Sequence, residues 1–152
     1  MAEKIVDPPL TDSAARLRMA IVRTARRLRQ EAADAGGAEL SPTAVAALAT
    51  VERHGPLTPS ELAEIERVKR PTATRTLRVL LEAGFVDRAP DPSDGRSALV
   101  SVNAAGREQL RRLRGRKNAY LARRMRNLPR EDLEALERAA EILEQILEGD
   151  ER

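Results

Sequence analysis

The sequence predicts a mainly α-helical protein with one small β-ribbon. Over most of the chain, apolar residues recur every three or four positions, which is the spacing of amphipathic helices. Residues 97–102 depart from this spacing, because Ala98, Val100 and Val102 fall on alternate positions, as in a half-buried strand. The Asp94-Gly95 pair just before them is typical of a hairpin turn, since glycine adopts positive φ without steric cost.

Composition removes several classes of function. The 152-residue chain is long enough for one compact unit and contains no cysteine, which excludes disulfides and thiolate metal sites. The single histidine, His54, is interpreted as a solvated residue at a helix end, so we expect neither a metal nor an organic cofactor. No apolar run approaches the roughly 18–20 residues that span a bilayer, and no signal peptide is visible. We therefore expect a cytoplasmic protein without a membrane partner.

The first elements along the chain are an arm and two helices. Residues 1–10 contain two adjacent prolines and predict a mobile or extended arm. A helix is expected over residues 11–34, with Leu17 and Ile21 on one apolar face. Ser41-Pro42 then starts the next helix, because serine caps helices and proline fits their first turn. Three apolar residues of this second helix are expected in the core: Val45, Leu48 and Val51.

A short helix with a strong start signal follows. Thr58-Pro59-Ser60-Glu61 is a capping box, in which Thr58 caps the helix and Glu61 reaches back to it. The apolar side of this helix consists of Leu62, Ile65 and, at its end, Val68.

After the short helix that Thr58 starts, the chain breaks at residues 68–70 and another helix begins. Pro71 starts it with φ already set, and Gly84 lies in the usual glycine position beyond its end. The expected buried stripe consists of Ala73, Leu77, Leu80 and Leu81. The opposite stripe carries Thr72, Arg75 and Arg78, so the outer face of this helix is polar and basic.

The ribbon completes the pattern. Residues 85–88 can pair back onto the strand at residues 97–102, and the polar loop between them ends in Arg96. This layout is typical of a winged helix-turn-helix: two short helices, of which the second is basic, and then a ribbon with an arginine at its tip. Such a ribbon can place arginine in a narrow minor groove, where the negative potential is enhanced.

Three segments in this order resemble the MarR family of bacterial transcriptional regulators over nearly the whole chain: PTATRTLRVLLEAGFV, DRAPDPSDGRSALVSV and NAAG. The family wing often reads D-x-R-D-x-R; here Asp91, Asp94 and Arg96 fit, while Ser93 replaces the first arginine. The Thr-Arg pair of the family's recognition helix corresponds to Thr74-Arg75. The resemblance implies a winged helix-turn-helix flanked by N- and C-terminal dimerisation helices.

The expected organisation has three parts. Residues 1–40 form the arm and a dimerisation helix, residues 41–103 the DNA-binding domain, and residues 104–152 the C-terminal dimerisation helices. The last helix is apolar over more surface than one neighbour covers, which suits either a dimer interface or an intramolecular bundle. The resemblance favours a homodimer, in which the terminal helices of two chains interlock. The expected interface residues are Leu17, Ile21, Leu133, Leu136, Leu143 and Leu147.

Charge is distributed unevenly along the C-terminal part. Residues 104–126 carry many arginines and lysines with Glu108 as their only acid, whereas residues 127–152 are mainly acidic. Two solvated faces that attract each other on packing are the favoured interpretation. The sequence does not decide whether the basic helix at residues 104–126 contacts DNA directly.

By this resemblance the protein is a repressor that binds a pseudo-palindromic double-stranded operator as a homodimer. A small effector, often aromatic or phenolic in the family, would bind between the dimer helices and the DNA module, but the sequence names no such ligand. The arginine at residue 75 can form a bidentate contact with guanine. The assigned roles are base reading for Thr72, Thr74 and Arg75, phosphate binding for Lys69, Arg70 and Arg78, and minor-groove contact for Asp94 and Arg96.

Other classes of function fit the sequence less well. A winged-helix module that binds a protein partner without sequence-specific DNA binding is the main alternative, although a polar and basic outer face suits phosphates better than an interface core. No catalytic residue is expected, because there is no nucleophile elbow or phosphate loop, and Asp91 and Asp94 lie on an exposed loop. The only aromatic residues, Phe85 and Tyr120, argue against base stacking on single strands.

Overall fold

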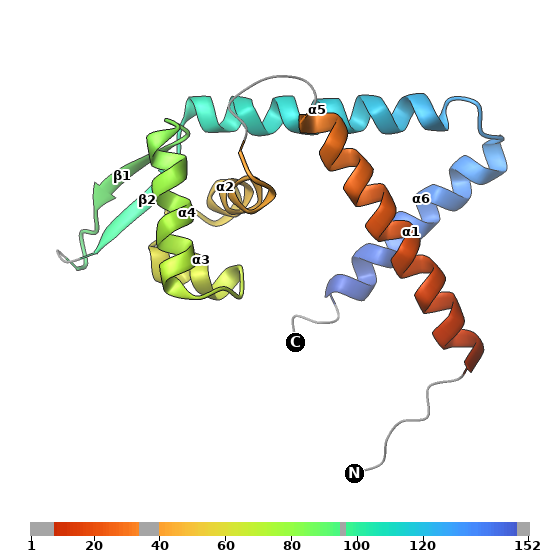
Figure 1. Cartoon of the computed structure of the whole chain (residues 1–152), viewed down its shortest axis with the longest axis horizontal. Coiled ribbons are helices and arrows are strands. Elements are labelled where there is room, and N and C mark those ends of the chain that lie inside the picture. Colours follow the sequence, from red (N-terminus) through yellow and green to blue (C-terminus); the bar gives the residue numbers. More distant parts are fainter. Residues whose placement is uncertain (1–7, 34–39, 95–96, 149–152) are drawn as a thin grey trace, which may run out of the picture. The chain divides into compact units, whose positions relative to one another are not determined.

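The computed structural model describes residues 8–33, 40–94 and 97–148, and it confirms the mainly helical class with one small sheet. The described residues fall into two compact units, within residues 1–117 and 118–152. In chain order the elements are α1 (Pro8–Ala33), α2 (Pro42–His54), α3 (Pro59–Ile65), α4 (Arg70–Glu82), β1 (Val86–Pro90), β2 (Ala98–Val102), α5 (Ala104–Met125) and α6 (Arg130–Glu148) (Figure 1). No helix among these residues is long and apolar enough to cross a membrane.

The N-terminal helix begins earlier than expected. Helix α1 starts at Pro8, so the prediction of an extended arm is wrong for residues 8–10. Prolines fit this position because the first N–H groups of a helix have no intrahelical partner and the proline ring presets φ. Residues 1–7 and Asp34 lie outside the described residues.

Two predicted helix starts are confirmed by their capping contacts. The Ser41 hydroxyl accepts a hydrogen bond from the Ala44 N–H at 3.2 Å. In α3 the Thr58 hydroxyl accepts from the Glu61 N–H at 3.2 Å, and the Thr58 N–H donates to the Glu61 carboxylate at 2.7 Å. The backbone N–H and then the hydroxyl of Thr58 hold the pKa of Glu61 below its ordinary value, because both stabilise the charged carboxylate.

Both short helices end in the same kind of turn. After α4, the Phe85 N–H donates to the Leu80 carbonyl and Gly84 has φ +74°, which is the glycine end predicted from the sequence. After α3, the Val68 N–H donates to the Ala63 carbonyl, and Arg67 occupies the left-handed position with φ +52°. A side chain at positive φ is strained, so packing of α3 against α4 must hold this turn in place.

The core lies between α2, α3, α4, the ribbon and the start of α5 (Figure 1). Its most buried large side chains include Leu48, Leu62 and Leu80. Of the residues expected in α2, Leu48 and Val51 are buried, whereas Val45 is only half-buried against the core.

Three apolar residues of the helix pair lie outside this core, contrary to expectation. Ile65, Val68 and Leu81 are 44%, 38% and 39% exposed. Helix α3 has only seven residues and directs Leu62 and Ala63 into the core, which leaves Ile65 on its exposed side and Val68 beyond its end. In α4 the buried stripe is Ala73, Leu77 and Leu80, and Leu81 lies about 40° beyond Leu77, at the edge of that stripe.

The ribbon has the predicted antiparallel pairing. Val86 lies opposite Val102 and Pro90 opposite Ala98. Leu57, just before α3, exchanges backbone hydrogen bonds with Val100 at 2.9 and 2.8 Å. This bridge anchors the middle of β2 to the segment just before α3, and both Leu57 and Val100 are buried.

Two glycines of α5 are expected to respond oppositely to alanine. A Cβ at Gly106 would collide with the backbone carbonyl oxygen of Phe85, which cannot rotate away, whereas a Cβ at Gly115 meets no described atom within 4 Å. Gly106→Ala should lower the free energy of unfolding by about 1–3 kcal/mol, as overpacking does. Gly115→Ala should raise it by about 0.5–1 kcal/mol, because alanine loses less backbone entropy in a helix.

Urea denaturation of both variants measures the two effects on one helix. Tolerance of Gly106→Ala would contradict the close approach of α5 to the turn between α4 and β1. Destabilisation by Gly115→Ala would contradict the open space beside that glycine.

Candidate nucleic-acid interface

Helix α4 presents its polar face outward. Because Ala73, Leu77 and Leu80 are buried, the opposite side of the helix is solvent-exposed. All six residues assigned to base or phosphate contact on or before this helix are exposed: Lys69, Arg70, Thr72, Thr74, Arg75 and Arg78.

A surface hollow of about 440 Å³ lies along this face. Its lining brings together Thr74 and the three arginines at positions 70, 75 and 78, with Pro71 between them. Lys69 and Thr72 do not line it; Lys69 precedes the first turn, and the Thr72 carbonyl accepts a hydrogen bond from the Thr76 hydroxyl at 3.0 Å. Three guanidinium groups beside a helix N-terminus make this hollow suited to a phosphate-bearing ligand.

Arg78 is only weakly constrained within the chain. Arg78 lies 3.8 Å from the Glu82 carboxylate, and both side chains are more than two-thirds exposed. An ion pair of this kind contributes little, because water screens it. Arg78 can therefore exchange this partner for a phosphate at small cost.

The wing loop is organised by Asp91. Its carboxylate accepts from the Ser93 hydroxyl at 2.7 Å and from the Ser93 N–H at 2.8 Å. These bonds, the hydroxyl first, hold the pKa of Asp91 below its ordinary value. The loop is closed by the Asp91 N–H donating to the Ser97 carbonyl and the Ser97 N–H donating to the Asp94 carbonyl.

The structure places only one of the two predicted wing residues. Asp94 is exposed next to the loop tip, whereas Arg96 lies outside the described residues. The pairing of Asp94 with Arg96 therefore stays a prediction. The role of Ser93 was not predicted, although an aspartate two residues before a serine is a readable signal for a local turn.

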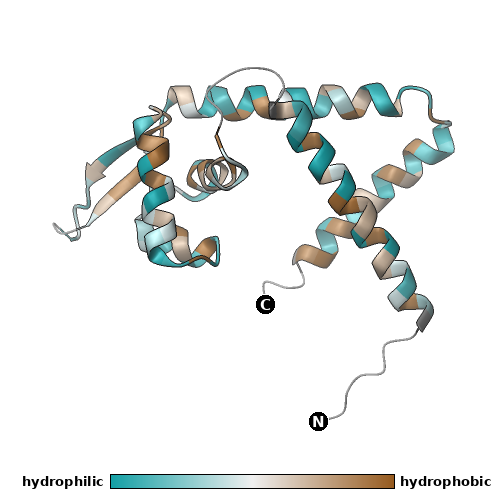
Figure 2. Cartoon of the chain, in the orientation of Figure 1, coloured by the Kyte–Doolittle hydropathy of each residue, from teal (hydrophilic) through white to brown (hydrophobic). Residues whose placement is uncertain are grey.

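The expected interface residues are largely uncovered in the single chain. Leu17 and Ile21 on α1 are exposed, and on α6 Leu136 and Leu147 are 46% and 70% exposed. Leu133 and Leu143 are half-buried. Figure 2 shows hydrophobic residues recurring along both helices.

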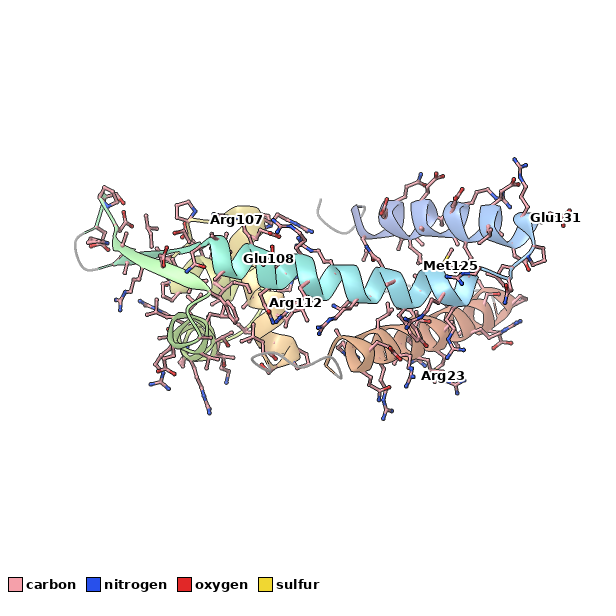
Figure 3. The ribbon with its side chains drawn as sticks, turned by 90° about the horizontal axis from the view of Figure 1, so that it is seen from above. Arg23, Arg107, Glu108, Arg112, Met125 and Glu131 are labelled. Atoms are coloured by element: carbon pink, nitrogen blue, oxygen red, sulfur yellow. The ribbon has the colours of Figure 1, made fainter. Side chains whose placement is uncertain are left out.

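The basic helix makes ion pairs within its own unit. Arg114 of α5 pairs with Glu52 of α2, and Arg111 pairs with Glu108 one turn away. Figure 3 shows Arg107, Glu108 and Arg112 along the first half of α5. Packing of this helix against the acidic C-terminal helix stays a prediction.

A second cavity, of about 720 Å³, lies between α1, α2 and the first half of α5. Its wall includes the buried Gln109, whose side-chain oxygen accepts from Arg112. The apolar part of the lining consists of Ala25, Leu28, Ala32, Leu40, Pro42, Val45, Ala46, Ala49 and Leu113. Four cationic residues stand around it: Arg29, Arg112, Arg116 and Lys117. The sequence alone could not reveal this cavity, because its residues come from distant segments.

Two short helices joined by a tight turn, with a basic second helix and a two-stranded ribbon after it, define a winged helix-turn-helix protein. A family model described as the MarR family matches residues 40–98. A helix-turn-helix-type transcriptional regulator of Mycobacterium bovis is 38% identical over 138 residues, covering 88% of this chain and 94% of that protein. The chain therefore belongs to the MarR family of helix-turn-helix transcriptional regulators.

Solved structures share the whole fold. A Pseudomonas aeruginosa protein described as a transcriptional regulator superimposes with a TM-score of 0.82 at 28% identity, covering 93% of this chain and 98% of its own. FabT from Streptococcus pneumoniae, solved in complex with DNA, gives a TM-score of 0.68 at 18% identity and covers 90% of this chain and 98% of its own. The likeness to FabT establishes the fold of this chain.

Proposed function

We propose that this protein regulates transcription by binding a pseudo-palindromic operator in double-stranded DNA as a homodimer. The observation that carries the proposal is the outward face of α4, where Thr74 and three arginines surround one hollow. Residues 41–103 would form the DNA-binding domain, and residues 1–40 and 104–152 the dimerisation segments. The DNA held by FabT, which has the same fold, supports this use of the winged helix-turn-helix. A regulator of this kind would act in the cytoplasm, where bacterial DNA lies.

The roles on α4 follow from side-chain chemistry. Arg75 has the donors for a bidentate contact with guanine, and Thr74 lies beside it at the same hollow. Thr72 is a weaker third candidate for base contact. We assign Lys69, Arg70 and Arg78 to phosphate contacts. Lys69 and Arg70 lie at the start of α4, and Arg78 lies beside Arg75 on the outer face of that helix.

The wing would contact the minor groove on the operator flanks. Arg96 directly precedes Ser97 in the sequence, and Ser97 closes the loop through its bonds with Asp91 and Asp94. Asp94 would orient the Arg96 guanidinium. Arginine gains from a narrow minor groove without reading base edges. Affinity should therefore rise with the A·T content of the flanks, and Arg96→Ala should remove that dependence.

We propose that a second copy of the chain packs against the apolar faces of α1 and α6. The two helices are complementary in charge, since α1 carries several arginines and α6 is rich in glutamate. Paired recognition helices would then reach successive major grooves with centres roughly 34 Å apart.

Selection of bound fragments from genomic DNA tests the proposal. We expect recovery of a dyad-symmetric motif, and higher expression of the adjoining gene when the protein is absent, as for a repressor. Lower expression would make the protein an activator. Recovery of random fragments only, together with a protein partner captured on the α4 face, would favour the interaction module instead.

The cavity beside α5 supports a response to a small effector. Its apolar lining and surrounding cations suit a small molecule with an apolar body and an anionic group. We expect octanoate to raise the melting temperature and to release the operator, whereas octanol should do neither. Differential scanning fluorimetry and fluorescence anisotropy measure the two effects. If octanoate and octanol act alike, the cations do not select the ligand.

A further inference from the structure

Asn103 stands where the ribbon meets the long helix α5. It lies between the end of β2 at Val102 and the start of α5 at Ala104. Its side-chain oxygen accepts a hydrogen bond from the Gly106 N–H at 3.0 Å, which caps the helix. Its own backbone N–H donates to the Phe85 carbonyl at 3.2 Å, so the backbone is held as well as the side chain.

The nitrogen of the same amide bonds in two other directions. It donates to the Gly84 carbonyl at 3.0 Å and to the Asp87 carboxylate at 3.1 Å. Gly84 terminates the recognition helix α4, and Asp87 belongs to the first strand of the wing. One side chain thus joins the end of α4, the base of the wing and the start of α5.

A capping role alone does not require the bonds that the amide nitrogen makes. Serine caps a helix about as well as asparagine, because either side chain supplies one acceptor oxygen. Only a longer side chain with N–H donors can also reach the Gly84 carbonyl and the Asp87 carboxylate. The flipped orientation of the Asn103 amide is excluded. The amide oxygen would then face the Gly84 and Asp87 oxygens, and the amide N–H groups would face the Gly106 N–H.

The backbone around this amide is closely packed. Gly106 approaches the Phe85 carbonyl so closely that no Cβ fits between them. The Arg107 guanidinium donates to the Val102 carbonyl at 3.0 Å, from the other side of the same junction. The start of α5 therefore rests on the connection between α4 and the ribbon.

We propose that Asn103 is a positioning residue for DNA binding, which holds the wing at a fixed distance from the end of the recognition helix. The proposal rests on the proposed function, in which α4 enters a major groove and the wing an adjacent minor groove. A wing that moves independently of α4 would lose part of the affinity gained from contacting both grooves at once.

Four variants separate this role from capping. Asn103→Ser keeps the cap oxygen and removes the bonds to Gly84 and Asp87, while Asp87→Ala removes one acceptor from the other side. The double variant tests coupling, and Asp87→Asn is the matched control, since its amide oxygen still accepts at the same place. Binding is measured on operators with A·T-rich and G·C-rich flanks, and backbone hydrogen exchange is measured on the protein without DNA.

We expect Asn103→Ser to weaken binding to the A·T-flanked operator by about 3- to 10-fold, the equivalent of one or two hydrogen bonds. The loss should be smaller on G·C-rich flanks, because the wing contributes less there. Asp87→Ala should behave similarly, the double variant should lose little more than Asn103→Ser, and Asp87→Asn should bind like the wild type. Exchange of the ribbon amides should rise several-fold in Asn103→Ser, with α6 unchanged.

Equal losses on both flanks, or strictly additive losses in the double variant, would overturn the proposal. So would unchanged ribbon exchange in Asn103→Ser. If the wild-type protein bound no DNA, the proposed function would fail, and the exchange experiment would still decide whether Asn103 holds the wing.

Discussion

Arg75→Ala is expected to cost about 1–3 kcal/mol of specific binding free energy, the usual worth of a bidentate contact with a base. Arg75 is exposed on the outer face of α4 and lines the hollow with Thr74. Arg75 would read one base pair in each half-site, so the variant should also lose the preference for that base pair. Binding to random DNA should change much less, since base contacts contribute little to non-specific affinity.

Arg70→Ala is the matched comparison on the same helix. Arg70 lies at the start of α4 and lines the same hollow, where we assign it to a phosphate. This variant should weaken binding to all sequences alike and reduce the slope of log affinity against log salt concentration by about 1. Fluorescence anisotropy on operator and random duplexes at several salt concentrations distinguishes the two residues. Equal losses by both variants on both DNAs would remove Arg75 as a base reader.

Replacing Leu136 and Leu143 of α6 together by aspartate is expected to convert the proposed homodimer to a monomer. Leu136 is 46% exposed and Leu143 half-buried in the single chain, so both are available to a second copy. A carboxylate at an apolar interface loses its hydration without gaining a partner, which costs several kcal/mol. At micromolar concentration, sedimentation velocity should change from a dimer to a monomer, and operator affinity should fall with it.

A polar position on the same helix supplies the control. Gln145 is exposed and lies on the side of α6 opposite Leu136 and Leu143, so Gln145→Asp adds a charge without touching the apolar face. This variant should remain a dimer. The helix content from circular dichroism separates dissociation from unfolding of α6. A wild-type protein that sediments as a monomer would contradict the proposed assembly directly.

Local signals in the sequence were sufficient for most of the fold. The Thr58–Glu61 capping box, the Ser41 cap and the glycine end at Gly84 are each formed by residues within a few positions of one another. Such interactions are encoded locally, so they can be read without knowing the rest of the structure. The same holds for the outward face of α4, because helical periodicity alone separates Arg75 from the buried Leu77 and Leu80.

Other features that the sequence did not reveal depend on how distant segments meet. The exposure of Ile65, Val68 and Leu81 was decided by which side of each helix packs into the core, and apolar periodicity does not fully specify that side. The cavity beside α5 exists only because residues from α1, α2 and α5 line one space.

The sequence by itself therefore determined the elements of this protein, their order and the polar face of its recognition helix, because short-range hydrogen bonding and helix periodicity fix these features. Tertiary structure alone decided how the wing is attached. The amide of Asn103 bonds to Gly84 and Asp87, which are 19 and 16 positions away, and Gly106 rests on the Phe85 carbonyl. Contacts of this kind depend on how packed elements meet, and no local pattern encodes that geometry.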